Sequence, residues 1–216
     1  EMVTARRAFL NGEHYAPIAD QLATIAQQLN PSTWLDIGCG EGFYTQHIAQ
    51  ALPNSTGYGI DVSKDAIRHS CQRSKQIHWL VASMANLPLA DQSCDLITSI
   101  FSPITWPEAL RVMHSGSTLV RLGPASDHLI ELREMLYDEV HPYDDSKHLK
   151  DAPHALHLES TQFIRYTLSL NDPADRHNLL AMTPHGWRAS QARRKAIIAA
   201  PINVTGAVRV DCFKQA

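Results

Sequence analysis

Apolar residues recur at helical spacing over the first thirty positions of the chain. Between Thr4 and Leu29 they fall three or four residues apart, which predicts helix. Asn11-Gly12 interrupts the pattern, so two helices are expected, and Asn30-Pro31 closes the region. We therefore expect residues 1–30 to form an N-terminal helical segment.

From residue 31 onward, short apolar runs alternate with amphipathic stretches. The expected strands are Thr33–Ile37, Thr56–Ile60, Ile77–Ala82, Asp95–Phe101 and Thr118–Leu122. The expected helices are Glu41–Ala51, Ser63–Gln72 with Ser63 as the N-cap, Trp106–Met113 and Ser126–Tyr137. Strands that alternate with helices predict an α/β fold, in which helices cover both faces of a mostly parallel sheet.

The last third of the chain changes character. Phe163–Leu170 is apolar and aromatic, and Val204–Phe213 alternates apolar with polar residues, so we expect an antiparallel C-terminal hairpin that completes a seven-stranded sheet. Helices at Pro173–Met182 and Ala189–Ala199 would form a helical insertion over 172–200. Residues 138–160, rich in His, Pro and Asp, are expected as a long ordered loop, and loops of this length are often functional.

The composition is that of an ordinary globular protein. Of 216 residues, 44% are hydrophobic and 19% are charged, with a formal net charge of −3. This balance excludes a protein that wraps nucleic acid with its whole surface. No apolar run approaches the ~18–20 residues of a membrane span, and no signal segment opens the chain. The cysteines Cys39, Cys71, Cys94 and Cys212 form no C-x-x-C pair, so we expect reduced thiols, a cytoplasmic protein and no metal site.

The strongest motif is Leu35-Asp36-Ile37-Gly38-Cys39-Gly40-Glu41-Gly42, between an expected strand and an expected helix. Glycines let the backbone turn sharply and approach a ligand. A dinucleotide site uses the spacing G-x-G-x-x-G and holds a pyrophosphate at the helix N-terminus. Here the spacing is G-x-G-x-G, and Asp36 precedes the first glycine by two residues. A carboxylate at that place repels phosphate but suits the ammonium group of a methionine moiety.

Two further segments continue the pattern along the sheet. Asp61 ends the second expected strand about 20 residues beyond the glycines, where an acid accepts hydrogen bonds from ribose hydroxyls. Ala82-Ser83-Met84-Ala85-Asn86-Leu87-Pro88-Leu89 follows the third expected strand. That segment would lie along the crevice at the carboxyl ends of the strands and could hold an adenine.

In this order, the three elements resemble the class I S-adenosylmethionine-dependent methyltransferases, which have a Rossmann-like α/β fold. The resemblance implies S-adenosyl-L-methionine as cofactor and residues 31–216 as the methyltransferase domain. The cofactor-binding residues expected on this basis are Asp36, Gly38, Cys39, Gly40, Gly42, Asp61, Val62, Ser83, Met84 and Ala85.

Segments outside the cofactor turn resemble one narrower group, the bacterial large-subunit (23S) rRNA guanine-N1 methyltransferases. They are Glu1-Met2 with Ala5 to Leu10, Gly12-x-His14-Tyr15-x-Pro17, Tyr44-Thr45, Gly59-x-Asp61-Val62-Ser63-Lys64-x-Ala66-Ile67, His128-Leu129-x-Glu131-Leu132, Tyr137-x-Glu139-Val140-His141 and Met182-Thr183-Pro184-x-x-Trp187-Arg188. The resemblance implies rRNA processing by RNA methylation and rRNA as the partner. It also implies cofactor contacts from Tyr15, Tyr44, Thr45 and His128, although Tyr15 could instead pack between helices and His128 could bond locally.

In that group a zinc-binding ribbon precedes this region, so we expect the chain to be a fragment or a relative without the ribbon. The chain also departs from the group's pattern at His114-Ser115-Gly116-Ser117 and at Phe101-Ser102-Pro103, the second of which stands where the target base should lie.

Phe101, Pro103, Trp106 and Arg188 are the expected substrate-binding residues, with core packing as the alternative for Phe101 and Trp106. The target base would be flipped out of its stack. No catalytic base is assigned, although the expected loop carries His141, His154 and His157.

The basic residues Arg6, Arg7, Arg188, Arg193, Arg194 and Lys195 could contact RNA or could be a solvated surface. The N-terminal helices could form a homodimer. Two other functions remain open from the sequence: a small-molecule methyltransferase of the same fold, and a non-catalytic module that binds S-adenosylmethionine.

Overall fold

The computed structural model describes residues 2–141 and 143–216, so Glu1 of the N-terminal motif and Pro142 of the expected loop lie outside the described residues. The contacts divide the chain into two compact units. Unit 1 comprises Glu1–Pro17, Pro124–Asp144 and Phe163–Val208, and unit 2 comprises Ile18–Gly123, Asp145–Gln162 and Arg209–Ala216. Each unit is described by itself.

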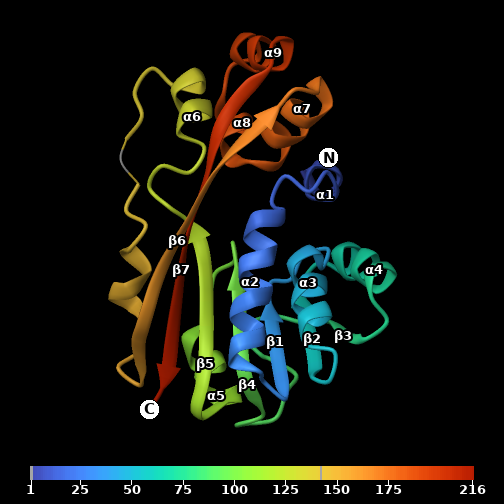
Figure 1. Cartoon of the computed structure of the whole chain (residues 1–216), viewed down its shortest axis with the longest axis vertical. Coiled ribbons are helices and arrows are strands. Elements are labelled where there is room, and N and C mark those ends of the chain that lie inside the picture. Colours follow the sequence, from blue (N-terminus) through green and yellow to red (C-terminus); the bar gives the residue numbers. More distant parts are fainter. Residues whose placement is uncertain (1, 142) are drawn as a thin grey trace. The chain divides into compact units, whose positions relative to one another are not determined.

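Within the described chain, seven strands form one sheet in the order β3-β2-β1-β4-β5-β7-β6. Their bounds are β1 Thr33–Ile37, β2 Thr56–Asp61, β3 Ile77–Val81, β4 Cys94–Ile100, β5 Met113–Pro124, β6 Leu156–Leu170 and β7 Ile202–Gln215. The pairs β2/β3, β1/β2, β1/β4 and β4/β5 are parallel. β7 runs opposite to both β5 and β6 (Figure 1). The predicted mostly parallel sheet with an antiparallel C-terminal hairpin is therefore confirmed.

The helices of unit 2 cover both faces of the sheet, as predicted. α2 (Ala16–Leu29) and α3 (Phe43–Ala51) lie on one face and α5 (Trp106–Val112) lies on the other, while α4 (Lys64–Arg73) lies beside β3 (Figure 1). α4 begins where predicted, because the Ser63 hydroxyl accepts a hydrogen bond from the Ala66 amide at 3.2 Å. A short 3₁₀ helix, η1, spans Lys147–Asp151.

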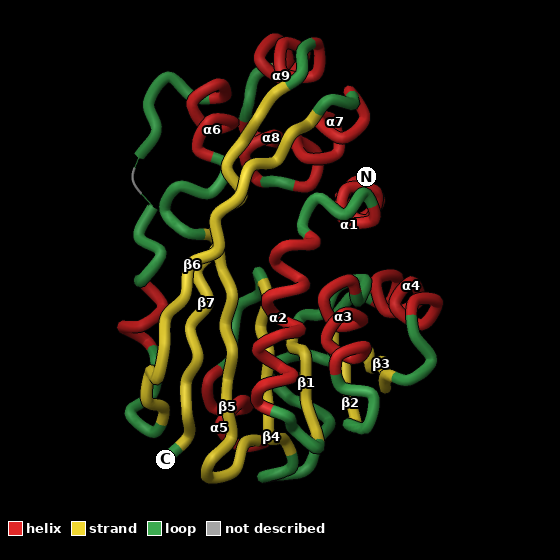
Figure 2. The backbone as a smooth tube through the Cα atoms, viewed as in Figure 1, coloured by secondary structure: helices red, strands yellow, loops and turns green. Residues whose placement is uncertain are grey.

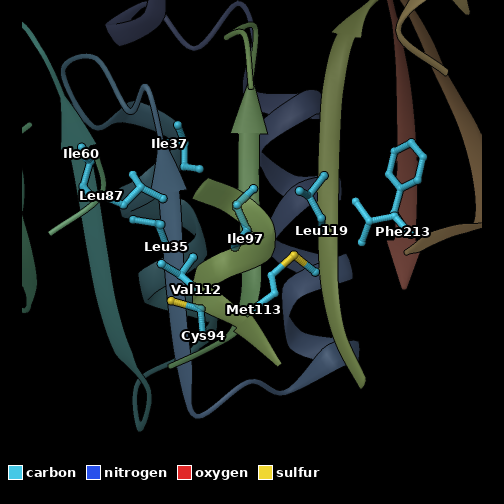
Figure 3. Packing of buried hydrophobic residues seen from close by; sticks show 12 residues of the cluster. Leu35, Ile37, Ile60, Leu87, Cys94, Ile97, Val112, Met113, Leu119 and Phe213 are labelled. Carbon is cyan, nitrogen blue, oxygen red and sulfur yellow. The ribbon is translucent and has the colours of Figure 1, made fainter. Parts of the chain in front are cut away.

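A cluster of buried apolar residues in unit 2 lies between the sheet and α5 (Figure 3). Leu35, Ile97 and Leu119 come from the central parallel strands, Val112 from α5 and Phe213 from β7, and each is at most 1% exposed. Apolar burial at roughly 25 cal/mol per Å² is the main force that holds these layers together. The strand ends that carry the polar motifs therefore stand on a rigid support.

Unit 1 is built from five helices in its described residues and from the strand segments that lie within it. They are α1 (Met2–Asn11), α6 (Ile130–Leu136), α7 (Pro173–Met182), α8 (Pro184–Arg188) and α9 (Gln191–Ala199), shown in red in Figure 2. Arg176 is buried on α7, and its guanidinium donates to the backbone oxygens of Leu170 and Ile198. These bonds satisfy a buried charge and fix α7 to the end of α9.

Four sequence expectations differ from the structure. β6 begins at Leu156, inside the expected loop 138–160, because this strand is mostly exposed and its polar residues conceal it. β5 begins at Met113 and not at Thr118, because a β-bulge around Gly116 (φ 87°) lets the strand continue through the polar residues that precede Thr118. The helix expected from Ser126 begins only at Ile130, because Leu129 adopts a left-handed conformation. α8 is an additional short helix inside the expected helical insertion over 172–200. Among the described residues, no helix has both the length and the apolarity needed to cross a bilayer.

Candidate functional site

Asp36 stands at the carboxyl end of β1 and is 1% exposed. Its two carboxylate oxygens accept hydrogen bonds from hydroxyl groups: Thr45 of α3 at 2.6 Å and Thr98 of β4 at 2.8 Å. A buried carboxylate is tolerated only where such donors compensate for its lost hydration. Asp36 therefore ties three elements together directly below the glycine turn.

The three glycines of the turn all adopt positive φ angles, of 71° at Gly38, 56° at Gly40 and 78° at Gly42. A Cβ at Gly42 would lie 2.5 Å from the Trp79 ring, so this glycine lets α3 approach the sheet closely. A Cβ at Gly40 would meet nothing within 4 Å. The turn is therefore packed against the Trp79 ring at Gly42 and open at Gly40, which leaves space for a ligand beside Gly40.

Asp61 ends β2 beside this open turn. One of its oxygens accepts from the Gly40 amide at 3.0 Å and the other accepts from the Ser63 amide at 2.8 Å. An ionised carboxylate offers about four acceptor positions, so room remains for the hydroxyls of a ribose. Val62 and Val81 follow at the ends of β2 and β3 and are 68% and 52% exposed. Two exposed apolar side chains beside a ribose acceptor suit the face of an adenine.

The electrostatics of the turn separate two cofactor classes. Burial raises the pKa of the Cys39 thiol far above its usual range, and the charges of Asp36 and Asp61 raise it further. The potential at the turn is therefore negative, which opposes a pyrophosphate and favours the ammonium group of a methionine moiety. The residues present thus fit S-adenosyl-L-methionine.

The segment after β3 contains the expected residues Ser83, Met84 and Ala85. The Ser83 hydroxyl accepts from the Ala85 amide at 3.2 Å, which closes a tight turn, and the side chains of Ser83 and Ala85 are exposed. The Ala82 amide donates to the Asp61 backbone oxygen at 3.1 Å, so this turn begins beside the ribose acceptor.

Two residues of α5 hold the continuation of this segment, and the sequence did not single them out. Glu108 accepts from the Leu87 amide at 2.7 Å, while Arg111 donates to the backbone oxygens of Leu87 and Leu89 and to Asp91. The two side chains also pair with each other at 2.8 Å. Hydrogen bonds from Arg111 and from the Leu87 amide lower the pKa of Glu108 to about 2. Their i, i+3 spacing on one helix was the only signal in the sequence.

The segment after β4 reaches back to the glycine turn. Phe101 has a left-handed backbone (φ 52°), and its ring lies 6.2 Å from the Tyr44 ring of α3. Pro103 is exposed, whereas Trp106 packs edge-on against Phe213 at 6.1 Å. Non-glycine residues with positive φ cluster at functional sites. Packing accounts for Trp106, so Phe101 and Pro103 are the better candidates to face a substrate.

Two other expected cofactor residues belong to unit 1, where they contact each other. The Tyr15 hydroxyl lies 3.2 Å from Nε2 of His128, and Nδ1 of His128 accepts from the Ala207 amide at 3.1 Å. Nδ1 is therefore unprotonated, which places the ring proton on Nε2. Burial lowers the pKa of His128 to about 4 and raises that of Tyr15, so both are neutral at pH 7.

The structure therefore brings together fifteen of the expected residues in unit 2, around the carboxyl ends of β1, β2, β3 and β4. They are Asp36, Gly38, Cys39, Gly40, Gly42, Tyr44, Thr45, Asp61, Val62, Ser83, Met84, Ala85, Phe101, Pro103 and Trp106. Tyr15, His128 and Arg188 lie in unit 1. The loop histidines His141, His154 and His157 are exposed. Within the described ranges, no group of three or more His, Cys, Asp or Glu residues could hold a metal ion.

Comparison with known proteins agrees with this geometry. A family model described as a methyltransferase domain matches residues 35–121. The chain is 30% identical to the 23S rRNA (guanine(748)-N(1))-methyltransferase of Streptomyces fradiae, over 87% of this chain and 69% of that protein. It is 33% identical to YxjB of Bacillus subtilis, provisionally named a 23S rRNA guanine-N1 methyltransferase, over 87% of this chain and 70% of YxjB.

More distant relatives and solved structures share the fold. The chain is 26% identical to a malonyl-[acyl-carrier protein] O-methyltransferase of Hahella chejuensis, over 61% of this chain and 49% of that protein. The structure of a provisionally named type II methyltransferase from Anaeromyxobacter dehalogenans gives a TM-score of 0.64 at 16% identity, covering 90% of this chain and 95% of the other. The plantazolicin methyltransferase BpumL, solved with S-adenosylhomocysteine, gives 0.55 at 12% identity, covering 99% and 90%.

Proposed function

This chain belongs to the class I S-adenosylmethionine-dependent methyltransferases, in the family of the 23S rRNA guanine-N1 methyltransferases, and from this membership we propose that it methylates N1 of a guanine in large-subunit rRNA. One observation carries the proposal. Two relatives named for that reaction are 33% and 30% identical over 87% of the chain, whereas the Hahella O-methyltransferase is 26% identical over 61%, and a BioHC protein of Cellvibrio japonicus that covers 92% is also only 26% identical.

S-adenosyl-L-methionine supplies an electrophilic methyl group on a sulfonium. Around it, Asp61 would bind the ribose, and the negative potential of the glycine turn would favour the ammonium group. Val62 and the Ser83–Ala85 turn would lie against the adenine. These contacts orient the cofactor before the target base arrives, which lowers the entropic cost of an in-line transfer.

The chain's contribution at the target base would come from the segment after β4. The left-handed backbone at Phe101 holds this segment against the glycine turn, where it would position the guanine and exclude water. Guanine N1 carries a proton at neutral pH, which has to leave before or during methyl transfer. Enzymes that act on a base atom usually take the base out of its stack.

The test is to incubate the protein with methyl-labelled cofactor and rRNA from cells that lack this methylation, and to map the label. We expect label on N1 of one guanine of the large-subunit rRNA, and none on small-subunit rRNA. Asp61→Asn should lower incorporation, because the ribose acceptor loses its charge. Label on malonyl-[acyl-carrier protein] or on a small metabolite, with none on rRNA, would overturn the proposal.

A further inference from the structure

A small hollow in unit 1 lies between α7, α8 and α9. Its lining includes His177 of α7, Trp187 of α8 and Arg194 of α9, and its volume is about 60 Å³. One buried water needs ~10–15 Å³ of such space, so the hollow can hold a few waters or one phosphate-sized group. A pocket for a whole metabolite usually exceeds ~300 Å³. The hollow therefore suits one small group of a larger ligand.

The rim of the hollow carries an exposed aromatic ring that is held in place. Trp187 is 53% exposed, and its indole Nε1 donates to the Ala181 backbone oxygen at 2.9 Å. At the neighbouring Gly186, an added Cβ would lie 2.0 Å from the Leu180 backbone oxygen, so α8 is packed directly against the end of α7. A fixed tryptophan face open to solvent is the arrangement that stacks an unpaired base.

A buried donor without a hydrogen-bond partner belongs to Arg194, one of the residues that line the hollow. Within residues 2–141 and 143–216, Nε of Arg194 is buried and makes no hydrogen bond. Its neighbour Arg193 differs, because that side chain donates to the Leu136 backbone oxygen and to Asp138. Buried polar groups in proteins are nearly always satisfied, so an unpaired guanidinium N–H calls for an acceptor from outside. A phosphate oxygen is the acceptor that guanidinium groups bind best.

The charges around the hollow favour an anion. Arg188 follows the exposed tryptophan, Lys195 follows Arg194, and both side chains are exposed. Burial lowers the pKa of His185, and the positive charges of Arg133 and Arg188 lower it further. Positive side chains therefore stand in and next to the lining of the hollow, although the net charge of the chain is −3.

We propose that the Trp187–Arg194 hollow binds an unpaired nucleotide of the RNA substrate, with a phosphate bonded to Arg194 and a base stacked on Trp187. This inference rests on the proposed function, since it names where that RNA is held outside unit 2. Arg188 and Lys195 would add charge attraction to the flanking phosphates, which makes binding depend on salt.

The test measures binding of a single-stranded oligoribonucleotide to the full chain, with inorganic phosphate as a second probe. Trp187→Ala should weaken oligonucleotide binding about fivefold or more, and Trp187→Phe should retain most of it, because a ring remains to stack. Arg194→Gln should weaken binding and lower the salt slope by about one unit. Phe163→Leu, another exposed aromatic, and Arg68→Gln, an exposed arginine on α4, are the matched controls.

The outcomes separate this inference from the proposed function. If wild-type protein methylates rRNA while Trp187→Ala and Arg194→Gln bind like the controls, the hollow is not an RNA site and the proposed function stands. Equal weakening in the Phe163 and Arg68 controls would also overturn it. If the same millimolar concentration of inorganic phosphate displaces half of the oligonucleotide from wild type and from Trp187→Ala, stacking on Trp187 adds no affinity and the proposal fails. If the wild-type protein does not methylate rRNA, the proposed function itself is refuted.

Discussion

Gly38 and Ser102 approach each other so closely that a Cβ added to Gly38 would lie 2.0 Å from the Ser102 hydroxyl oxygen. Gly38 belongs to the turn after β1, which cradles the cofactor, and Ser102 belongs to the segment after β4. The Ser99 hydroxyl donates to the Ser102 backbone oxygen at 2.9 Å and holds that segment in place. The cofactor turn and the segment expected to face the target base therefore form one rigid contact.

This contact predicts a severe effect for Gly38→Ala. The left-handed backbone costs an alanine roughly 1–2 kcal/mol, and the new Cβ also forces the Ser102 segment away. We expect affinity for S-adenosylhomocysteine, measured by calorimetry, to fall at least about tenfold. Gly40→Ala has the same backbone cost but open space, so it should lose less. The double variant Gly38→Ala/Ser102→Gly should recover part of the loss; no recovery would refute the steric explanation.

Removing either hydroxyl that bonds Asp36 should destabilise the fold. Thr45→Val and Thr98→Val preserve shape but leave a buried carboxylate oxygen without its donor, at a cost of roughly 1.5–3 kcal/mol each. The free energy of unfolding in urea measures this cost. Thr45→Ser keeps the hydroxyl and should lose much less. A larger loss in the serine variant than in Thr45→Val would show that the methyl group, not the hydrogen bond, supports the turn.

The order of elements could be predicted from the sequence, because apolar spacing indicates which positions are buried and glycines mark the turns between elements. Strands and helices with one buried face give such patterns. β6 shows where this fails. Its residues from Glu159 to Gln162 are polar and mostly exposed, so a strand at the edge of the sheet resembles a loop. The left-handed backbone at Leu129 makes the helix expected from Ser126 begin only at Ile130, and no residue type in the sequence indicates this conformation.

The candidate site could be predicted only in part. The glycine turn and Asp61 carry a spacing that depends on local backbone geometry, and the structure brings them together. Thr98 and Ser102 act through partners more than 60 residues away in the sequence, Asp36 and Gly38, which no local pattern reveals. Tyr15 and His128 contact each other within unit 1, and their cofactor contact stays a prediction.

The pair Glu108 and Arg111 should act on cofactor affinity rather than on the transfer step. Arg111→Lys removes the fork that bonds Leu87, Leu89 and Glu108 together, so the adenine-side segment loses its support. We expect a KM for S-adenosylmethionine several-fold higher and a kcat nearly unchanged. Arg68→Lys, which alters an exposed pair with Asp65 on α4, is the control. A fall in kcat at unchanged KM would show that the segment serves the chemistry instead.

His128 should make the fold less stable in acid. Its pKa is about 4 in the folded chain, mainly because it is buried, and near 6.5 when unfolded. Between these values the unfolded chain binds a proton that the folded chain does not, so stability falls as the pH decreases from about 6.5 to 4. The full difference is about 3 kcal/mol, and it is absent above this window. Urea unfolding at several pH values measures the slope.

His128→Asn isolates that slope, because its side-chain oxygen can still accept from the Ala207 amide while carrying no titratable group. We expect this variant to lose less stability than wild type over the same pH range. His141→Asn, at a side chain that is 82% exposed, is the control and should follow the wild-type slope. If His128→Asn and His141→Asn give the same slope as wild type, His128 is protonated in the fold, and the hydrogen bond from Ala207 to an unprotonated Nδ1 does not exist in solution.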